Sequence, residues 1–279
     1  MLDRINDNEK ISFKEKNGVV LIQFKNLKKY EDILIHGFTT RFGGVSTGEC
    51  RTMNLGFNRN DIRENVLENY KRVAETLEIN YEHMVFSNQV HDSKVKVVCE
   101  SDRGKGIIRS SDIIGYDGLV TNINEVAIVT FYADCVPLLF FDPVKRVIAE
   151  SHSGWRGTVK EIASVTIRRM EEEYASSIND IEVAIGPSIG KCCFEVGEEV
   201  ISEFSEKLPW SYEFCHKTGT DKWHIDLQSI IHKSLINTGI NKNNIVSSNV
   251  CTKCNKDVFF SHRGDCGKTG SMAAIMQLK

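Results

Sequence analysis

Two almost unbroken apolar runs separated by a short turn sequence constrain the fold of this chain more than any other feature. They lie in "YADCVPLLFFDPVKRVIAESHSGWRGT", residues 132–158. Such runs are typical of central strands, and "DPVKR" predicts a tight turn that pairs them as a hairpin. Cys135 precedes the first run and His152 ends the second, so we expect these side chains to converge at the open end of the hairpin. Packing explains this placement, and so does a metal site or a nucleophile.

The other apolar patterns predict strands interleaved with helices. A polar turn inside residues 84–99 separates two further predicted strands, and Gly43-Gly44 predicts a turn after residue 40. A helix over 158–174 is expected to begin at a capping box of Thr158 and Glu161. The helix over 62–77 has an apolar stripe of Ile62, Val66, Tyr70, Val73 and Leu77. Other strands are predicted at 19–25, 33–40, 126–131, 137–141, 181–186, 244–250 and 271–278, and other helices at 196–207 and 226–238.

This order of elements indicates a single-domain α/β sandwich over residues 1–279, with mixed β-sheets and flanking helices. Hairpins outnumber βαβ units, and "RFGGVSTG" lacks the glycine spacing of a dinucleotide-binding fingerprint, so a Rossmann fold is not expected.

Composition excludes several classes of protein. The formal net charge of -3 and the absence of a long Lys/Arg block argue against nucleic-acid binding. The longest apolar run, "VPLLFF", is too short to cross a membrane, and "MLDRINDNEK" has no apolar signal segment. The nine cysteines form no disulfide framework, which favours a reducing compartment. We therefore expect a cytoplasmic protein without a membrane or nucleic-acid partner.

A third side chain extends the pair at the hairpin end. His91, in "SNQVHDSK", lies at another predicted strand end beside a polar turn. Cys135 with two histidines makes a three-ligand set for zinc, with a fourth position open for water or substrate. The alternative is a buried cysteine and two histidines bonded to backbone carbonyls.

Three weaker patterns also stand out. Cys251 and Cys254 in "CTKC", with His262 and Cys266 downstream, offer four ligands for a structural zinc, although the spacing is not that of a standard finger. Arg41 beside Gly43-Gly44 predicts an anion site in a backbone nest, or an ordinary turn. Arg156, after Trp155, opens a predicted helix and has the same two interpretations.

Five motifs together resemble the laccase-domain family, whose members are also labelled polyphenol oxidases and multifunctional purine nucleoside phosphorylases. They are "SNQVH", "ADCVPLLF", "AESHSGWRGT", "GPSIGKCCFEVG" and "CTKCNKDVFFSHRGDCGKTG", and the resemblance runs from about residue 34 to the C-terminus. It implies a fold related to cysteine hydrolases and one zinc per chain, held by His91, Cys135 and His152. It also places Arg41 and Asn54 at the rim of the pocket, and assigns no metal to the segment containing Cys251 and Cys254.

The chain departs from the family pattern at one place. The family usually shows "FFSYRRDG" where this chain has "FFSHRGDC", so His262 replaces an aromatic residue and Gly264 replaces an arginine. If that arginine binds the anionic substrate, Arg263 must serve alone here.

The resemblance implies phosphorolysis of adenosine, inosine and guanosine, cleavage of S-methyl-5'-thioadenosine, and adenosine deamination. Purine nucleosides and phosphate are therefore the expected partners, with Cys135, His152, His91 and Arg41 as catalytic residues and Arg41, Asn54 and Arg263 as substrate-binding residues. The proton donor to the leaving purine stays open among Asp134, Asp117 and a zinc-bound water. The sequence does not indicate the oligomeric state.

Three other functions compete with this one. A Cys135–His152 dyad without metal predicts a hydrolase or deamidase, and a zinc-stabilised binding module predicts no turnover. A copper polyphenol oxidase is set aside, because the eight histidines include no His-x-His pair and an open zinc shell suits hydrolytic or phosphorolytic chemistry better.

Overall fold

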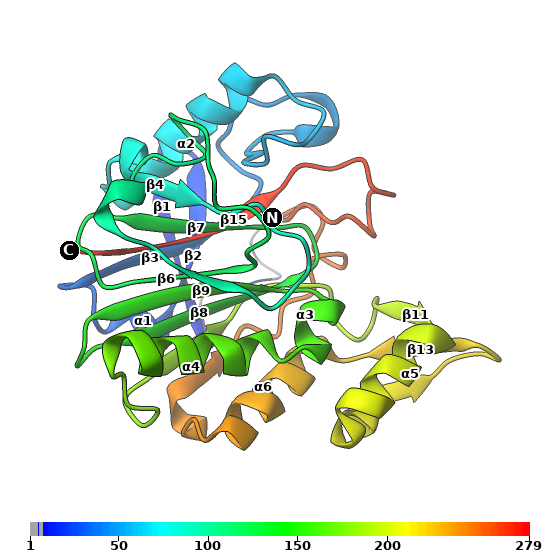
Figure 1. Ribbon diagram of the computed structural model, residues 1–279. Coiled ribbons are helices and arrows are strands. Elements are labelled where there is room, and N and C mark those ends of the chain that lie inside the picture. Colours follow the sequence, from blue (N-terminus) through cyan, green and yellow to red (C-terminus); the bar gives the residue numbers. More distant parts are fainter. Residues whose placement is uncertain (1–4, 6–7) are drawn as a thin grey trace.

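The computed structural model describes Ile5 and residues 8–279, and its centre is a pair of six-stranded sheets (Figure 1). In the first sheet only β4 and β7 run parallel to each other, and every other neighbouring pair is antiparallel. Its order is β1 (Ile11–Lys16), β2 (Val19–Phe24), β3 (Leu34–Thr39), β15 (Met272–Leu278), β7 (Ala127–Tyr132) and β4 (Met84–Phe86).

The second sheet is also mixed. Its outer pairs, β10 with β14 and β5 with β6, are parallel, whereas the inner pairs are antiparallel. Its order is β14 (Ile245–Ser247), β10 (Glu182–Ile185), β8 (Val136–Asp142), β9 (Val147–Ser153), β6 (Gly118–Thr121) and β5 (Val95–Val97).

The predicted hairpin is confirmed as β8 and β9. The two strands pair antiparallel from Val136 opposite Ser153 to Asp142 opposite Val147, and every residue in both is buried. The Asp142 carboxylate closes the turn by accepting the backbone N–H groups of Val144 and Lys145. Burial on both faces explains why the apolar runs are nearly continuous.

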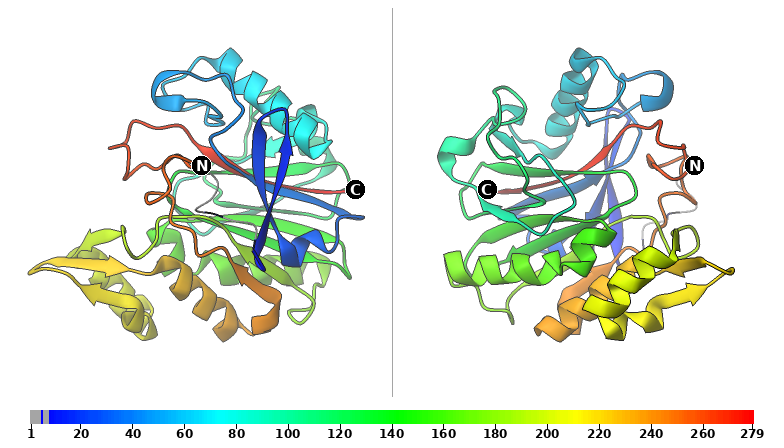
Figure 2. Two further views of the ribbon diagram at one scale, coloured as in Figure 1. Left: turned by 180° about the vertical axis from the view of Figure 1, so that it is seen from behind. Right: turned by 45° about the vertical axis from the view of Figure 1, so that its right-hand side comes forward.

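Helices cover the outer faces of the two sheets (Figures 1 and 2). Helix α2 (Arg63–Leu77) packs on the first sheet, while α4 (Ile162–Tyr174) and α6 (Leu227–Thr238) pack on the second. A further apolar layer, which includes Phe38 and Phe141, fills the space between the sheets. The predicted fold class, an α/β sandwich with mixed sheets and flanking helices, is confirmed. The remaining helices are α1 (Lys25–Lys28), α3 (Trp155–Val159) and α5 (Glu198–Lys207).

Two details of the predicted helices are wrong. Ile62 precedes α2 as its N-cap and is 62% exposed, so it is not part of the buried stripe, which begins at Val66. Thr158 and Glu161 form no capping box. Thr158 lies inside α3 and donates to the carbonyl of Gly154, whereas Glu161 precedes α4 in a left-handed conformation (φ 53°) without a side-chain cap.

A third, smaller sheet projects with α5 at one end of the molecule (Figures 1 and 2). It contains β11 (Glu195–Gly197), β13 (Lys222–Ile225) and β12 (Cys215–Lys217). The first residues of the helix predicted at 196–207 therefore belong to β11. The strand predicted at 244–250 shortens to β14, and the two strands predicted within 84–99 lie in different sheets as β4 and β5.

Short 3-10 turns connect several of these elements, at Gly48–Cys50, Tyr81–His83, Glu100–Asp102, Pro209–Phe214 and Lys242–Asn244. Across the part of the chain that the structure describes, no helix has the length and apolar character to cross a membrane. The prediction that residues 1–10 carry no signal segment falls largely outside the described residues.

Candidate metal centre

His91, Cys135 and His152 come together where the chain passes from one central sheet to the other. Cys135 lies in the connection from β7 to β8, His152 lies in β9, and His91 lies in the loop after β4. Their three ligand atoms all lie within 4.8 Å of one another, and the Cys135 Sγ is 3.8 Å from the His91 Nε2. The two imidazole rings stand edge to face with centroids 4.8 Å apart.

The Asp117 carboxylate connects two of these side chains. Its Oδ1 lies 2.8 Å from the Nδ1 of His152 and also accepts the backbone N–H of His91 at 2.9 Å. Its Oδ2 accepts the backbone N–H groups of Val90 and Asp92. A carboxylate that accepts from Nδ1 fixes the ring orientation and leaves Nε2 for a metal.

Gly154 allows the three side chains to approach. It follows β9 opposite Cys135, and a Cβ at this position would lie 2.9 Å from the His91 Cδ2 and 3.1 Å from the Cys135 Sγ. His91 itself has a left-handed backbone (φ 63°), which the hydrogen bond to Asp117 helps to hold.

Electrostatics favours a charged cysteine at this place. Burial disfavours the thiolate, but the charges and hydrogen bonds of His152 and His91 lower the pKa of Cys135 to about 6. Burial likewise opposes a charged His152, but Cys135 and Asp117 raise its pKa to about 9. Burial also opposes ionisation of Asp117, yet its bonds to His152 and the backbone lower its pKa. Without metal, these opposite shifts favour a thiolate on Cys135 and an imidazolium on His152.

The donor set fits a zinc ion. Two imidazole nitrogens and one thiolate are a common zinc combination, and zinc–ligand distances of about 2.0–2.3 Å put tetrahedral nitrogen–sulfur edges near about 3.6 Å. The Sγ–Nε2 separation of 3.8 Å is close to that edge. His91 is exposed on the cavity side, so a fourth position is accessible from outside.

These side chains line a cavity of about 680 Å³. This volume lies within the range of small-ligand pockets, about 300–1,000 Å³. The lining combines aromatic rings, amides and one arginine: Phe57, Phe86, Phe131, Tyr132, Asn58, Asn88, Gln89 and Arg59, with His262 and Ser271. The Ser87 hydroxyl also lies on this lining, and no described residue accepts or donates a hydrogen bond to it.

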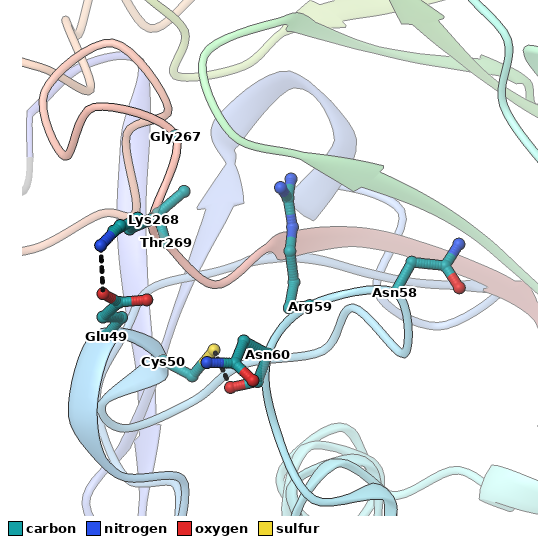
Figure 3. Close-up of a pocket in the computed structure, with 8 residues that line it drawn as sticks. All are labelled: Glu49, Cys50, Asn58, Arg59, Asn60, Gly267, Lys268 and Thr269. Atoms are coloured by element: carbon teal, nitrogen blue, oxygen red, sulfur yellow. Dashed lines mark hydrogen bonds and ion pairs between the residues drawn. The ribbon is translucent and has the colours of Figure 1, made fainter.

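Arg59 lines both this cavity and a smaller one of about 350 Å³, whose lining residues are drawn in Figure 3. Its Nε donates to the Ser271 hydroxyl at 2.8 Å, and none of the described residues accepts a hydrogen bond from its terminal nitrogens. Figure 3 shows the guanidinium extended away from the ion pair of Glu49 and Lys268. Burial lowers the pKa of Arg59, while the nearby Cys50 and Cys135 side chains oppose this effect. The sequence analysis missed this residue, although it lies five positions after Asn54 in "MNLGFNRND".

The structure does not bring Arg41 to the cavity. Its Nε and one terminal nitrogen donate to the carbonyl of Arg51, and the other terminal nitrogen donates to the carbonyl of Lys256. Gly43 permits close backbone packing at this place, because a Cβ on it would lie 2.5 Å from the Gly18 carbonyl oxygen.

Asn54 and Arg263 are also absent from the described cavity lining. Asn54 is fully buried, where its side-chain oxygen accepts the backbone N–H groups of Gly56 and Ser271, so it holds the loop that carries Arg59. Arg263 donates from its guanidinium to the carbonyl of Glu195. His262, the departure from the family pattern, does line the cavity.

The other predicted candidates lie outside the centre. The Asp134 carboxylate faces a neighbouring loop, where it accepts the Thr252 hydroxyl and the backbone N–H of Arg263. The Arg156 guanidinium stacks on Trp155 at the surface, 4.3 Å from the ring centroid. The predicted ligand set of Cys251, Cys254, His262 and Cys266 is wrong, because His262 lies in the cavity and Cys266 is not grouped with the other two cysteines.

Comparisons with known proteins cover most of the chain. The family model described as multi-copper polyphenol oxidoreductase laccase matches residues 35–279. Purine nucleoside phosphorylase YlmD of Bacillus subtilis is 35% identical over 248 residues, 88% of this chain and 89% of that protein. Purine nucleoside phosphorylase LACC1 of Homo sapiens is 32% identical over 89% of this chain, which spans only 56% of the human protein. The crystal structure of YlmD from Geobacillus stearothermophilus superposes with a TM-score of 0.89 at 32% identity, over 96% of this chain and 98% of that one.

Proposed function

This chain belongs to the family described as multi-copper polyphenol oxidoreductase laccase, and from that premise we propose that it is a zinc-dependent purine nucleoside phosphorylase. The proposed substrates are adenosine, inosine, guanosine and S-methyl-5'-thioadenosine, with adenosine deamination as a second activity of the same centre. Relatives that carry the name purine nucleoside phosphorylase, at 35% and 32% identity, support the reaction class.

The observation that carries the proposal is the group of His91, Cys135 and His152 on the wall of a cavity large enough for a nucleoside. These three residues would hold one zinc, and Asp117 would orient His152 behind it. A zinc bound there supplies a Lewis acid and activates water at neutral pH. The histidine count and the absence of His-x-His pairs do not favour copper chemistry.

Phosphorolysis requires a phosphate held beside C1' of the ribose. A phosphate oxygen forms a bond to C1', the C1'–N9 bond breaks, and the purine takes up a proton. Arg59 is the guanidinium on the cavity lining, and its terminal nitrogens suit a phosphate. Neither Asp134 nor Asp117 lines the cavity, so neither contacts a purine there, whereas His262 does line it.

A purine ring is suited to the aromatic part of the lining. Phe57 and Phe131 are only partly buried and offer ring surface for stacking. The Gln89 amide pairs with both backbone groups of Phe131, which fixes that wall of the cavity.

The chain has nine cysteines, and all nine are unpaired. This supports a reducing compartment such as the cytoplasm.

A second candidate, a metal-independent Cys135–His152 hydrolase, is favoured by one observation. The pKa of Cys135 is lowered to about 6 and that of His152 raised to about 9, as in an activated cysteine nucleophile. His91 separates the two functions, because it is a zinc ligand in the first, whereas in the second it only assists His152 in lowering the pKa of Cys135. His91→Ala should abolish turnover in the phosphorylase and leave the dyad hydrolase partly active.

Product analysis tests the proposed function. Purified protein with a measured zinc content is incubated with adenosine, with and without inorganic phosphate. The phosphorylase should release adenine and ribose 1-phosphate only with phosphate, and the deaminase should release inosine in both samples. Adenine release that is independent of phosphate, together with free ribose, would indicate a hydrolase instead.

A further inference from the structure

Four cysteines from two distant segments meet at a place outside the cavity lining. Cys192 and Cys193 lie in the segment after β10, and Cys251 and Cys254 lie in the segment after β14. The two segments run side by side, since Ser188 bridges to Cys251 and its carbonyl accepts the backbone N–H of Thr252.

The four sulfur atoms have the spacing of a tetrahedral thiolate site. All lie within 4.8 Å of one another, and the Cys254 Sγ is 3.4 Å from that of Cys192 and 3.5 Å from that of Cys193. Zinc–sulfur bonds of about 2.3 Å place the sulfurs of a regular tetrahedron about 3.8 Å apart. The sulfur–sulfur distances in the cluster, 3.4 Å and 3.5 Å for two pairs and within 4.8 Å for all, are therefore close to the separation that a bound zinc requires. A disulfide would use only two of the four sulfurs, at about 2.05 Å.

The backbone around the cluster is arranged for thiolate sulfur. The N–H of Gly190 donates to the Cys251 Sγ at 3.2 Å. Cys251 is the first cysteine of a C-x-x-C segment, "CTKC", a spacing common among zinc ligands. A Cβ on Gly190 would lie 3.1 Å from the Cys251 Cβ and 3.4 Å from the Cys192 Sγ, so glycine permits the two segments to approach. Lys191 and Lys253 directly precede two of the cysteines and add positive charge to both segments.

A divalent cation would displace the thiol protons of the four cysteines, because thiolates and not thiols are its ligands.

We propose that Cys192, Cys193, Cys251 and Cys254 bind a second zinc ion in a closed structural site. Four sulfur ligands leave no position for substrate, so this ion takes no part in the reaction. It is separate from the centre formed by His91, Cys135 and His152, and it does not depend on the proposed function of that centre.

The second site has a structural consequence for the first. The Thr252 hydroxyl, inside the "CTKC" loop, donates to the Asp134 carboxylate at 2.6 Å, and the N–H of Ile189 donates to the Asp134 carbonyl at 2.8 Å. Asp134 has a left-handed backbone (φ 88°) and directly precedes Cys135. A zinc that joins the two segments would thus hold the strained residue that positions Cys135.

Metal analysis combined with site-resolved alkylation tests this proposal. The double variant Cys192→Ser/Cys254→Ser should contain about one zinc per chain less than the parent protein. Cys99→Ser removes an exposed cysteine outside the cluster and should leave the metal content unchanged. Unchanged metal content in the double variant would overturn the proposal.

Alkylation of the parent protein keeps the test valid if the double variant does not fold. With zinc bound, Cys192 and Cys254 should react much more slowly than Cys99 and Cys266, although all four are exposed. A chelator should make the first two reactive, as read by peptide mass spectrometry. Equal labelling of all four before chelation, or a Cys192–Cys254 disulfide in the purified protein, would show that no zinc is bound there.

Discussion

The Oδ1 atom of Asp117 lies 2.8 Å from the Nδ1 of His152, and the same oxygen accepts the backbone N–H of His91. One buried carboxylate thus fixes the ring of one proposed ligand and the backbone of another. Since β9 and the loop after β4 supply these two residues, Asp117 joins two parts of the chain that must stay in register for a metal to bind.

Asp117→Asn should therefore weaken metal binding. Both carboxylate oxygens of Asp117 accept hydrogen bonds, whereas an asparagine side chain has only one acceptor oxygen. The loss of a carboxylate behind a ligand histidine costs about 10–100-fold in metal affinity. Competition with a coloured chelator measures the change. Asp142→Asn is the matched control, because Asp142 accepts two backbone N–H groups at the opposite end of β8. It should lower stability and leave metal affinity unchanged; an equal loss in both variants would contradict a specific role for Asp117.

Gly154→Ala should disturb the metal centre without a comparable effect on the fold. The added methyl group would lie 2.9 Å from the His91 ring and 3.1 Å from the Cys135 sulfur, so one of them must move. A displacement on the order of 1 Å costs roughly 100-fold in turnover. Gly157→Ala is the control, since its Cβ would have no contact nearer than 3.4 Å. Similar turnover in the two variants would show that the ligands tolerate the methyl group.

Arg59→Gln should raise the Michaelis constant for phosphate. A hydrogen bond to a charged group contributes about 1.5–3 kcal/mol, which corresponds to about 10–100-fold in binding. Zinc content should not change, because Arg59 is not a ligand. Arg41→Gln is the comparison, since the Arg41 guanidinium is held by the carbonyls of Arg51 and Lys256. If only Arg41→Gln changes the dependence on phosphate, the anion site lies at the position predicted from the sequence.

Glu150→Gln should change how stability depends on pH. Glu150 is fully buried in β9; one carboxylate oxygen accepts from the Thr130 hydroxyl, and no described residue pairs with the other. Burial raises the pKa of Glu150 well above its usual value, and the bonds from Thr130 only partly offset this. The native protein thus keeps a proton that the unfolded chain releases above about pH 4.3.

The sign of the effect follows from this proton. As the pH rises from about 5 towards the native-state pKa, the parent protein should lose about 1.4 kcal/mol of stability per pH unit relative to Glu150→Gln. Urea unfolding at several pH values measures the difference. Glu182→Gln is the control, because Lys29 lies 2.6 Å from that buried carboxylate. A constant difference between parent and Glu150→Gln across this range would mean that Glu150 is ionised in the folded protein.

The hairpin and the meeting of three side chains followed from local patterns. Strands buried on both faces require continuous apolar runs, and a tight turn determines which ends meet, so Cys135 and His152 were placed correctly by sequence. The distribution of strands between sheets was not predictable in this way. β4 and β5 lie in one short segment yet join different sheets, and an apolar pattern carries no information about which layer a strand enters.

Which arginine lines the cavity was not predictable for a related reason. Two glycines beside an arginine suggested a nest, but tertiary packing uses Gly43 for close approach to the Gly18 backbone. Arg59 had no such local signal, because its position depends on Asn54 holding its loop against Ser271. The four-cysteine cluster was missed similarly. Cys192 and Cys193 are adjacent in sequence, and only the pairing of two remote segments brings them to Cys251 and Cys254.

The dependence of Cys135 reactivity and of nucleoside cleavage on bound metal tests the central claim most directly. Protein stripped with a chelator is assayed for phosphate-dependent release of adenine from adenosine, before and after zinc is restored, while alkylation of Cys135 is followed by peptide mass spectrometry. The thiolate is shielded when it binds zinc. We expect cleavage to be lost on stripping and recovered with zinc, and Cys135 to be alkylated only in the stripped protein. Full turnover in metal-free protein, with rapid labelling of Cys135 while zinc is bound, would contradict the metal centre and favour the Cys135–His152 dyad.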